Sequence, residues 1–230
     1  MELIAQVLLV LLALSSLFQM SQWPIGARII LSFLLTIFAF YSYPWVIEQS
    51  KEQLNLWLED PNKMQNLAVV LLIEAFLFIF LDLALLKKCF GQSVNSYVKY
   101  ASFYPGIFLL AVVLYAQMLC FYSFSDIDFD TLGIIFALGL SIFLFLGPMA
   151  IKWLIPEDFL RMELRYILNF GLILGGIVIT VFCQGLTYPS SQDSIEWIGL
   201  IIVIALSISM MGLGWLGAKM GKRMKFLWKF

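Results

Sequence analysis

The sequence of 230 residues contains no histidine. Histidine is the commonest protein ligand for transition metals, a frequent general base, and the side chain whose charge changes most readily near neutral pH. Its absence excludes histidine-ligated zinc or haem, Ser-His-Asp catalysis and a histidine pH switch. Any chemistry must therefore use carboxylate, hydroxyl, thiol or lysine side chains.

Other signatures of enzymes are missing as well. The three cysteines, Cys89, Cys120 and Cys183, form no CxxC pair, and there is no Gly-rich phosphate loop. The acidic stretch SDIDFD, residues 125–130, lacks the glycine and distal glutamate of a calcium loop. With a net charge of −1, the chain also gives no sign of binding nucleic acid. We expect no catalytic residue, no metal site and no cofactor.

Charged residues are scarce, at 13% of the chain, whereas 62% of the residues are hydrophobic. Soluble domains are about a quarter charged and about half apolar. The apolar residues come in blocks of about 20, which suffice to cross a hydrocarbon core of roughly 30 Å. The sequence therefore predicts one polytopic transmembrane domain over residues 1–230.

Seven apolar runs predict an all-α bundle of seven transmembrane helices. The first run lacks the basic flank of a signal peptide, so we interpret it as a span. An amphipathic stretch at 46–60, ended by Pro61, predicts a helix lying in the membrane interface. The predicted spans are 3–20, 28–46, 67–86, 103–122, 132–152, 166–186 and 197–217.

The basic residues predict the orientation. With seven spans, 12 of the 14 Lys and Arg residues fall in one set of loops and termini, and only Lys51 and Lys63 in the other. Because basic residues stay in the cytosol, we expect an external N-terminus, a cytosolic C-terminus and a multi-pass protein of the plasma (inner) membrane. Basic and aromatic residues of the tail predict an anchor on the anionic membrane surface: Lys222, Arg223, Lys225, Trp228 and Lys229.

Two sequence patterns concern the packing of the helices. Closely spaced small residues permit tight contact in lipid, either within the chain or with a partner: Gly171, Gly175, Gly214, Gly217, Ala218 and Gly221. RIILSFLL at 28–35 and RYILNFGL at 165–172 agree at five of eight positions. This agreement suggests a parallel repeat in which spans 1–3 correspond to spans 5–7, with the fourth span as linker.

Two carboxylates, Glu74 and Asp82, lie inside the third predicted span. Eight residues of helix separate them by about 12 Å along the axis and roughly 80° around it, so both face broadly one side. An ionised carboxylate near the bilayer centre costs at least about 2.5 kcal/mol. Both acids should therefore face the bundle interior or be protonated. Both acids are candidates for a proton or cation site. The alternative for Glu74 is a packing acid, and the alternative for Asp82 is an anchor at the inner interface near Lys87 or Lys88.

Polar residues of other spans can be matched to these acids by depth. Gln117 falls near the level of Glu74, and Asn169 near the level of Asp82. Gln184 and Thr180 lie in the outer half of the sixth predicted span. They either form an internal path or join helices by hydrogen bonds.

Two functions fit these observations. The first is a membrane transport protein, or a membrane subunit of a transport complex, coupled to protons or cations through Glu74. The second is a non-catalytic accessory or scaffold subunit of a larger cell-envelope complex that a separate proton channel or ATPase energises. The expected partners are the lipid bilayer and either other membrane subunits or further copies of this chain.

Overall fold

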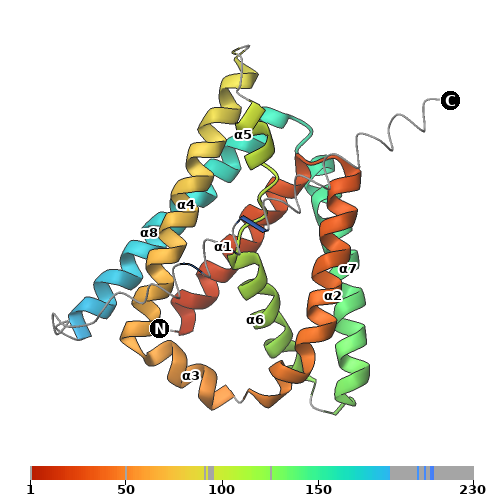
Figure 1. The fold of residues 1–230 in the computed structure, drawn as a ribbon, viewed down its shortest axis with the longest axis vertical. Coiled ribbons are helices and arrows are strands. Elements are labelled where there is room, and N and C mark those ends of the chain that lie inside the picture. The colour runs from red at the N-terminus through yellow and green to blue at the C-terminus, as the bar shows by residue number, and fades with distance from the viewer. Residues whose placement is uncertain are drawn as a thin grey trace.

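The computed structural model describes residues 2–49, 51–90, 92, 96–124, 126–186, 201, 205, 208 and 209. Every regular element within these residues is an α-helix (Figure 1). The helices are α1 (Glu2–Ser21), α2 (Ile25–Glu48), α3 (Lys51–Glu59), α4 (Pro61–Cys89), α5 (Ser96–Ala101), α6 (Phe108–Ser123), α7 (Phe129–Leu154) and α8 (Asp158–Leu186).

Five of these helices, α1, α2, α4, α7 and α8, are long and apolar enough to cross a membrane. This finding confirms the prediction of a membrane protein with transmembrane helices. The seventh predicted span and the basic tail lie outside the described residues, apart from four single positions. The span count, the orientation and the repeat therefore remain predictions, as do the roles of Gly214, Gly217, Ala218, Gly221, Lys222, Arg223, Lys225, Trp228 and Lys229.

The predicted interfacial helix at 46–60 is divided between two elements. Helix α2 continues through Pro44 to Glu48, and α3 then begins at Lys51. Asp60 lies between α3 and α4. It caps the start of α4, because its Oδ1 accepts the N–H groups of Asn62 at 3.1 Å and Lys63 at 3.4 Å. With Pro61 as the first residue of α4, this is a standard helix start.

The fourth predicted span, 103–122, is not one continuous helix. Helix α5 ends at Ala101, residues 102–107 are not helical, and α6 has only 16 residues. Pro105 cannot donate a backbone hydrogen bond and disfavours a helical residue before it. Gly106 follows with φ of +92°, a conformation that glycine adopts readily.

The predicted loop before the sixth span is largely helical. Only residues 155–157 separate α7 from α8, which begins at Asp158. The Arg161 side chain is 1% exposed and donates to the carbonyl groups of Ile155 and Pro156, at the C-terminal end of α7. Arg161 and Arg165 are among the 12 basic residues that the predicted spans place in loops, since the charged stretch before residue 166 interrupts the apolar pattern. That placement is wrong, because both residues lie in α8.

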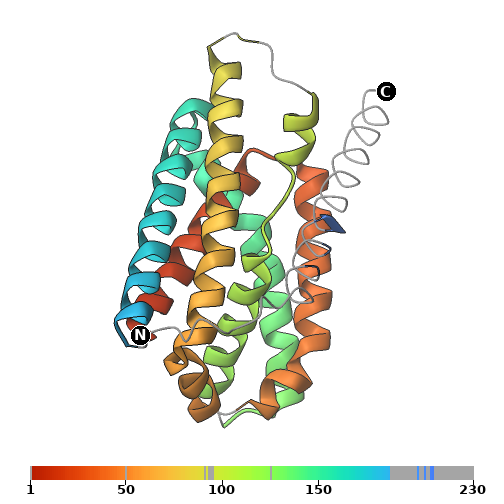
Figure 2. The same cartoon turned by 60° about the vertical axis from the view of Figure 1, so that its left-hand side comes forward.

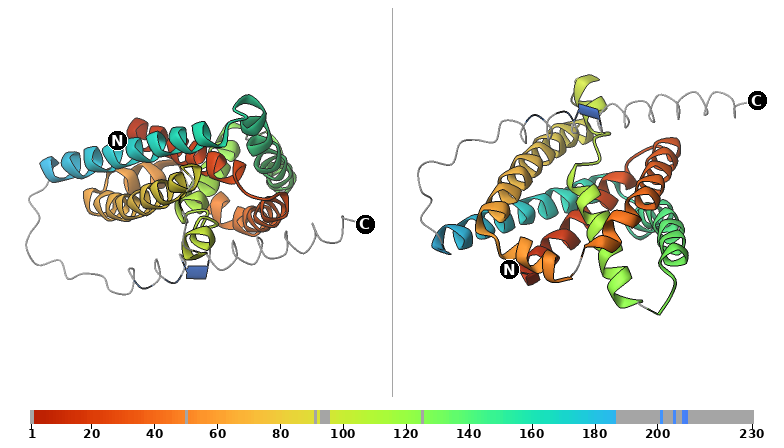
Figure 3. Two further views of the ribbon diagram at one scale, coloured as in Figure 1. Left: turned by 90° about the horizontal axis from the view of Figure 1, so that it is seen from above. Right: turned by 60° about the horizontal axis from the view of Figure 1, so that its bottom comes forward.

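Helix α1 crosses the bundle diagonally and contacts α6, α7 and α8 (Figure 1). Helices α4 and α8 form one packed pair and α2 and α7 another, with α1 and α6 between them (Figures 2 and 3). A Cβ atom on Gly175 would collide with Leu8 of α1, and one on Gly176 would lie 2.9 Å from Leu72 of α4. Gly171 is less confined, since its nearest neighbour, Leu11, would be 3.9 Å away. Small residues of α8 thus allow close contact with both α1 and α4.

Candidate functional site

Glu74 lies midway along α4 and faces the break between α5 and α6. Its side chain is only 5% exposed. Oε2 accepts the N–H group of Phe108, the first residue of α6, at 3.4 Å, and the N–H group of Ile107 also points toward the carboxylate. A Cβ atom on Gly106 would overlap Glu74 Oε1. Glycine at this position therefore gives the chain its turn and leaves room for the carboxylate.

Two side chains from the end of α1 and the turn that follows it hold the broken backbone. Gln19 Nε2 donates to the carbonyl oxygen of Tyr104 and, at 3.2 Å, to that of Ser102. Trp23 Nε1 donates to the same Ser102 oxygen at 2.9 Å. Irregular backbone at membrane depth is tolerated where protein groups satisfy its hydrogen bonds. Gln19 of α1 and Trp23 just after α1 supply these groups, so the break is a built feature of the fold.

The electrostatics around Glu74 are nearly balanced. The N-terminus of a helix stabilises a negative charge by about 0.3–1 kcal/mol, and by up to about 2 kcal/mol in buried geometry. A hydrogen bond to a charged group contributes about 1.5–3 kcal/mol, and less when it is as long as this one. These terms are comparable to the cost of at least about 2.5 kcal/mol for an ionised carboxylate at the bilayer centre. Within the described residues Oε1 has no well-formed hydrogen bond.

Asp82 belongs to a second, fully buried polar cluster. Its Oδ1 lies 3.1 Å from Nη1 of Arg165, and its Oδ2 accepts a hydrogen bond of 2.8 Å from Asn169. Ser15 of α1 donates to Asn169 at 2.6 Å, and the Arg165 guanidinium lies 5.4 Å from the ring centre of Phe78. The cluster therefore joins α1, α4 and α8 through one charge pair.

Asn169 lies beside Asp82, as the matching of residues by depth suggests. The predicted position of Asp82 at the inner interface, by contrast, is wrong. The side chain is 0% exposed and pairs with Arg165, so it is not an interfacial anchor. Sequence reasoning missed Arg165 because it lay in the supposed loop. One signal was present: Arg161, Arg165 and Asn169 recur every four residues, the spacing of one helix face.

The other predicted polar partners lie elsewhere. Gln117 donates to the carbonyl oxygen of Ala39 at 2.9 Å and accepts from Ser42 at 3.0 Å, so it joins α6 to α2. It is nine residues beyond Phe108, which places it about 13 Å from the Glu74 end of α6. Thr180 donates to the carbonyl oxygen of Gly176 in its own helix. The Gln184 side chain lies outside the described part of the chain.

Comparisons with protein-family models, with curated proteins and with solved structures find no match for this chain. Among the described residues, no group of three or more Cys, Asp or Glu side chains is placed to hold a metal ion. The two buried acids and their surroundings are therefore the features that bear on function. Of these, Asp82 pairs with Arg165, whereas the neighbours of Glu74 among the described residues are the backbone amide groups of Ile107 and Phe108 and apolar groups such as Phe78.

Proposed function

We propose that the chain is a membrane transport protein of the plasma (inner) membrane, in which Glu74 binds and releases the coupling proton. One observation carries the proposal: a buried carboxylate midway along α4 faces the N-terminus of α6, where the backbone is broken. Transporters often bind substrates and coupling ions near the bilayer centre, at helices interrupted in this way.

The proposed cycle has two states. With Glu74 protonated, the carboxyl group is neutral and the site stays closed and dry. With Glu74 ionised, the carboxylate is held by the amide groups at the start of α6 and attracts water or a cation. Because these two states are close in free energy, a modest change in the surroundings can move the proton. The hinge that responds is the Pro105–Gly106 break.

The test uses the purified chain in liposomes that contain a pH-sensitive dye. Gradients of amino acids, sugars, organic ions and divalent metal ions are imposed in turn, and proton movement is measured. We expect a gradient of one of these classes of solute to drive proton movement through the native protein. Glu74→Gln, which keeps the shape of the side chain, should abolish it, whereas Glu52→Gln on exposed α3 should not. Unchanged coupling in Glu74→Gln, or no coupling with any class, would reject the proposal.

The alternative, an accessory subunit of a larger complex, is favoured by α7, the least buried of the five long helices within the described residues. Its exposed apolar face can receive lipid or the helices of another subunit. Native purification followed by mass spectrometry separates the two functions. Stoichiometric partner subunits together with absent coupling in liposomes would favour the accessory role.

A further inference from the structure

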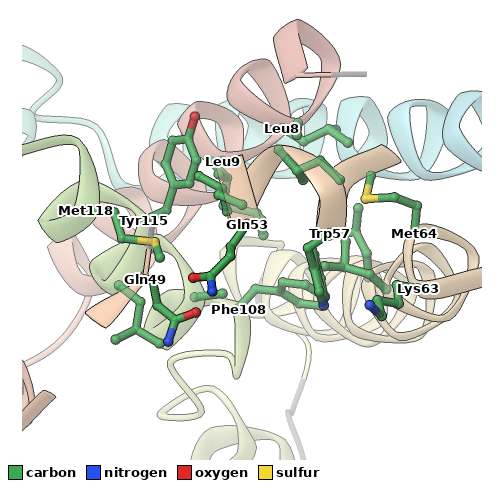
Figure 4. Close-up of a pocket in the computed structure, with 18 of the residues that line it drawn as sticks. Leu8, Leu9, Gln49, Gln53, Trp57, Lys63, Met64, Phe108, Tyr115 and Met118 are labelled. Carbon is green, nitrogen blue, oxygen red and sulfur yellow. The ribbon is translucent and has the colours of Figure 1, made fainter. Parts of the chain in front are cut away.

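A cavity of about 570 Å³ lies beneath α3 (Figure 4). Helix α3 is at the end of the bundle opposite α5 (Figure 1). Six helices line the cavity, namely α1, α2, α3, α4, α6 and α8. Its volume falls within the range of about 300–1,000 Å³ typical of small-molecule sites. The cavity is separate from the Glu74 carboxylate, although Phe108 lines the cavity and also donates its N–H group to Glu74.

The cavity changes from apolar to polar along its length. Leu12, Leu71, Phe108 and Ala111 form apolar walls that extend toward the middle of the bundle. The amide and charged side chains come from the corner between α2 and α4, where the chain leaves the spans: Gln49, Gln53 and Lys63. One further polar group, the hydroxyl of Tyr115, comes from α6. Figure 4 shows Gln49, Gln53 and Lys63 on one side of the cavity, with Leu8 and Leu9 on the other. A molecule that fills this space must itself be apolar at one end and polar at the other.

Aromatic residues place the polar end at the membrane surface. Trp45 and Trp57 line the cavity and are 53% and 39% exposed. Tryptophan is enriched at the level of the lipid head groups, where its ring is partly buried and its N–H group is hydrated. The opening therefore lies where the head group of a lipid would lie, and the apolar walls lie at the depth of its chain.

A second cavity shows that this gradient is not a general result of loose packing. It has a volume of about 360 Å³ and lies between α1, α6 and α7. Ser16 is the one side chain with a polar group among the residues described as lining it. An apolar gap of this kind can be filled by the tails of bulk lipid. The larger cavity beneath α3 offers hydrogen-bonding groups as well.

The charges near the opening restrict the head group. Lys63 already forms an ion pair of 3.2 Å with Asp60. Helix α3 and the residues beside it carry four acids, Glu48, Glu52, Glu59 and Asp60, but only two lysines, Lys51 and Lys63. An anionic head group would be repelled there, whereas an uncharged or zwitterionic one can bond to the glutamine amides.

We propose that the cavity beneath α3 binds a single-chain lipid with no net charge, such as a lysophosphatidylcholine. Its acyl chain lies along the apolar walls toward Phe108, and its head group contacts Gln49 and Gln53. The volume of about 570 Å³ favours one acyl chain over two. This site does not depend on proton binding by Glu74.

The test uses the full chain in nanodiscs of diacyl phosphatidylcholine. A lysophosphatidylcholine with a photoreactive diazirine in its acyl chain is added, and the cross-linked residues are mapped by mass spectrometry. We expect saturable labelling of cavity residues such as Met64, Ala111 and Tyr115. Unlabelled lysophosphatidylcholine should displace the probe, and an ionised fatty acid should compete less well.

Two substitutions from different helices fill the cavity. Ala111→Phe and Leu9→Trp should each weaken saturable labelling about tenfold or more, which corresponds to about 1.4 kcal/mol. The matched control is Ala150→Phe on the exposed surface of α7, which should leave labelling unchanged. Glu74→Gln should also keep the labelling, so failure of the proton-coupling proposal would not be mistaken for failure of this one.

Three results would overturn the proposal. One is labelling spread over lipid-facing residues without saturation. Another is saturable labelling that neither cavity-filling variant reduces. The third is a dimer in native mass spectrometry that only the cavity-filling variants dissociate, since the cavity would then receive a second copy of the chain. If both variants fail to fold, the labelling map of the native protein still decides.

Discussion

At the residue scale, the two buried acids have different roles because their neighbours differ. Asp82 has a guanidinium and an amide as partners, whereas Glu74 has backbone N–H groups at a helix start. The sequence alone predicted that both acids face the interior or are protonated, since exposing a charged carboxylate to lipid is too costly. It could not rank their environments, because the partner of each lies on a distant part of the chain.

The Asp82–Arg165 pair gives a stability prediction. Asp82→Asn should lower the free energy of unfolding by about 3–5 kcal/mol, since it leaves Arg165 charged and buried without its partner. Adding Arg165→Met should restore most of that loss. Denaturant unfolding in detergent micelles measures both changes.

The pair of Asp158 with Arg161 supplies the control, since only its carboxylate is exposed and the buried Arg161 keeps its hydrogen bonds to the carbonyl groups of Ile155 and Pro156. Asp158→Asn should have a much smaller effect than Asp82→Asn, because the Asp158 side chain is 73% exposed and solvent screens such pairs. Equal effects of the two substitutions would contradict the account of Asp82.

Gly106 gives a second prediction at this scale. Gly106→Ala should destabilise the protein by about 1–2 kcal/mol from its left-handed backbone alone, and more because the added methyl group displaces Glu74. Gly139→Ala is the matched control, because a Cβ atom there meets nothing within 4 Å. Alanine within a helix should be neutral or stabilise it by up to about 1 kcal/mol. Thermal unfolding of both variants measures the difference, and equal melting temperatures would contradict the prediction.

At the element scale, the sequence predicted where the long helices lie but not how they end. Apolar length identified most spans, since the need to cross lipid dominates their composition. The same criterion concealed the break at 102–107, because Tyr104, Pro105 and Gly106 do not interrupt an apolar run. The Pro-Gly pair was the available signal. Hydrogen bonds from Gln19 and Trp23 keep the break in place. They could not be predicted from the sequence, because they depend on tertiary packing.

Asp60 lies just before α4 and its candidate span, and it gives a prediction outside the membrane-spanning segments. Slight burial raises the pKa of Asp60, but hydrogen bonds from Lys63 and Asn62 outweigh it and hold the pKa below its ordinary value. The ionised form therefore stabilises this corner above the ordinary pKa, and the stabilisation is lost as the pH falls through the lowered value. Asp60→Ala should speed hydrogen exchange in the first turn of α4, whereas Asp60→Asn, also a good N-cap, should change it little. Equal exchange in the two variants would contradict the capping role.

At the scale of the whole molecule, the described helices place α3 and α5 at opposite ends of the bundle (Figure 2). The distribution of basic residues predicts that the α3 end is external. In a variant with Cys89, Cys120 and Cys183 replaced by alanine, Glu52→Cys should react with a membrane-impermeant maleimide added to intact cells. Gln92→Cys should react only after the membrane is opened. The reverse pattern would show the opposite orientation.

The short length of α6 has a consequence for biogenesis. Helix α6 has 16 residues, fewer than the about 20 that a helix needs to enter a bilayer independently. Helix α6 should therefore depend on neighbours that are already in the membrane when it leaves the ribosome. The side chains that hold its entry segment, Gln19, Trp23 and Glu74, all precede it in the chain. Synthesis from the N-terminus thus delivers the supporting groups before the segment that needs them, so the chain order itself favours correct insertion.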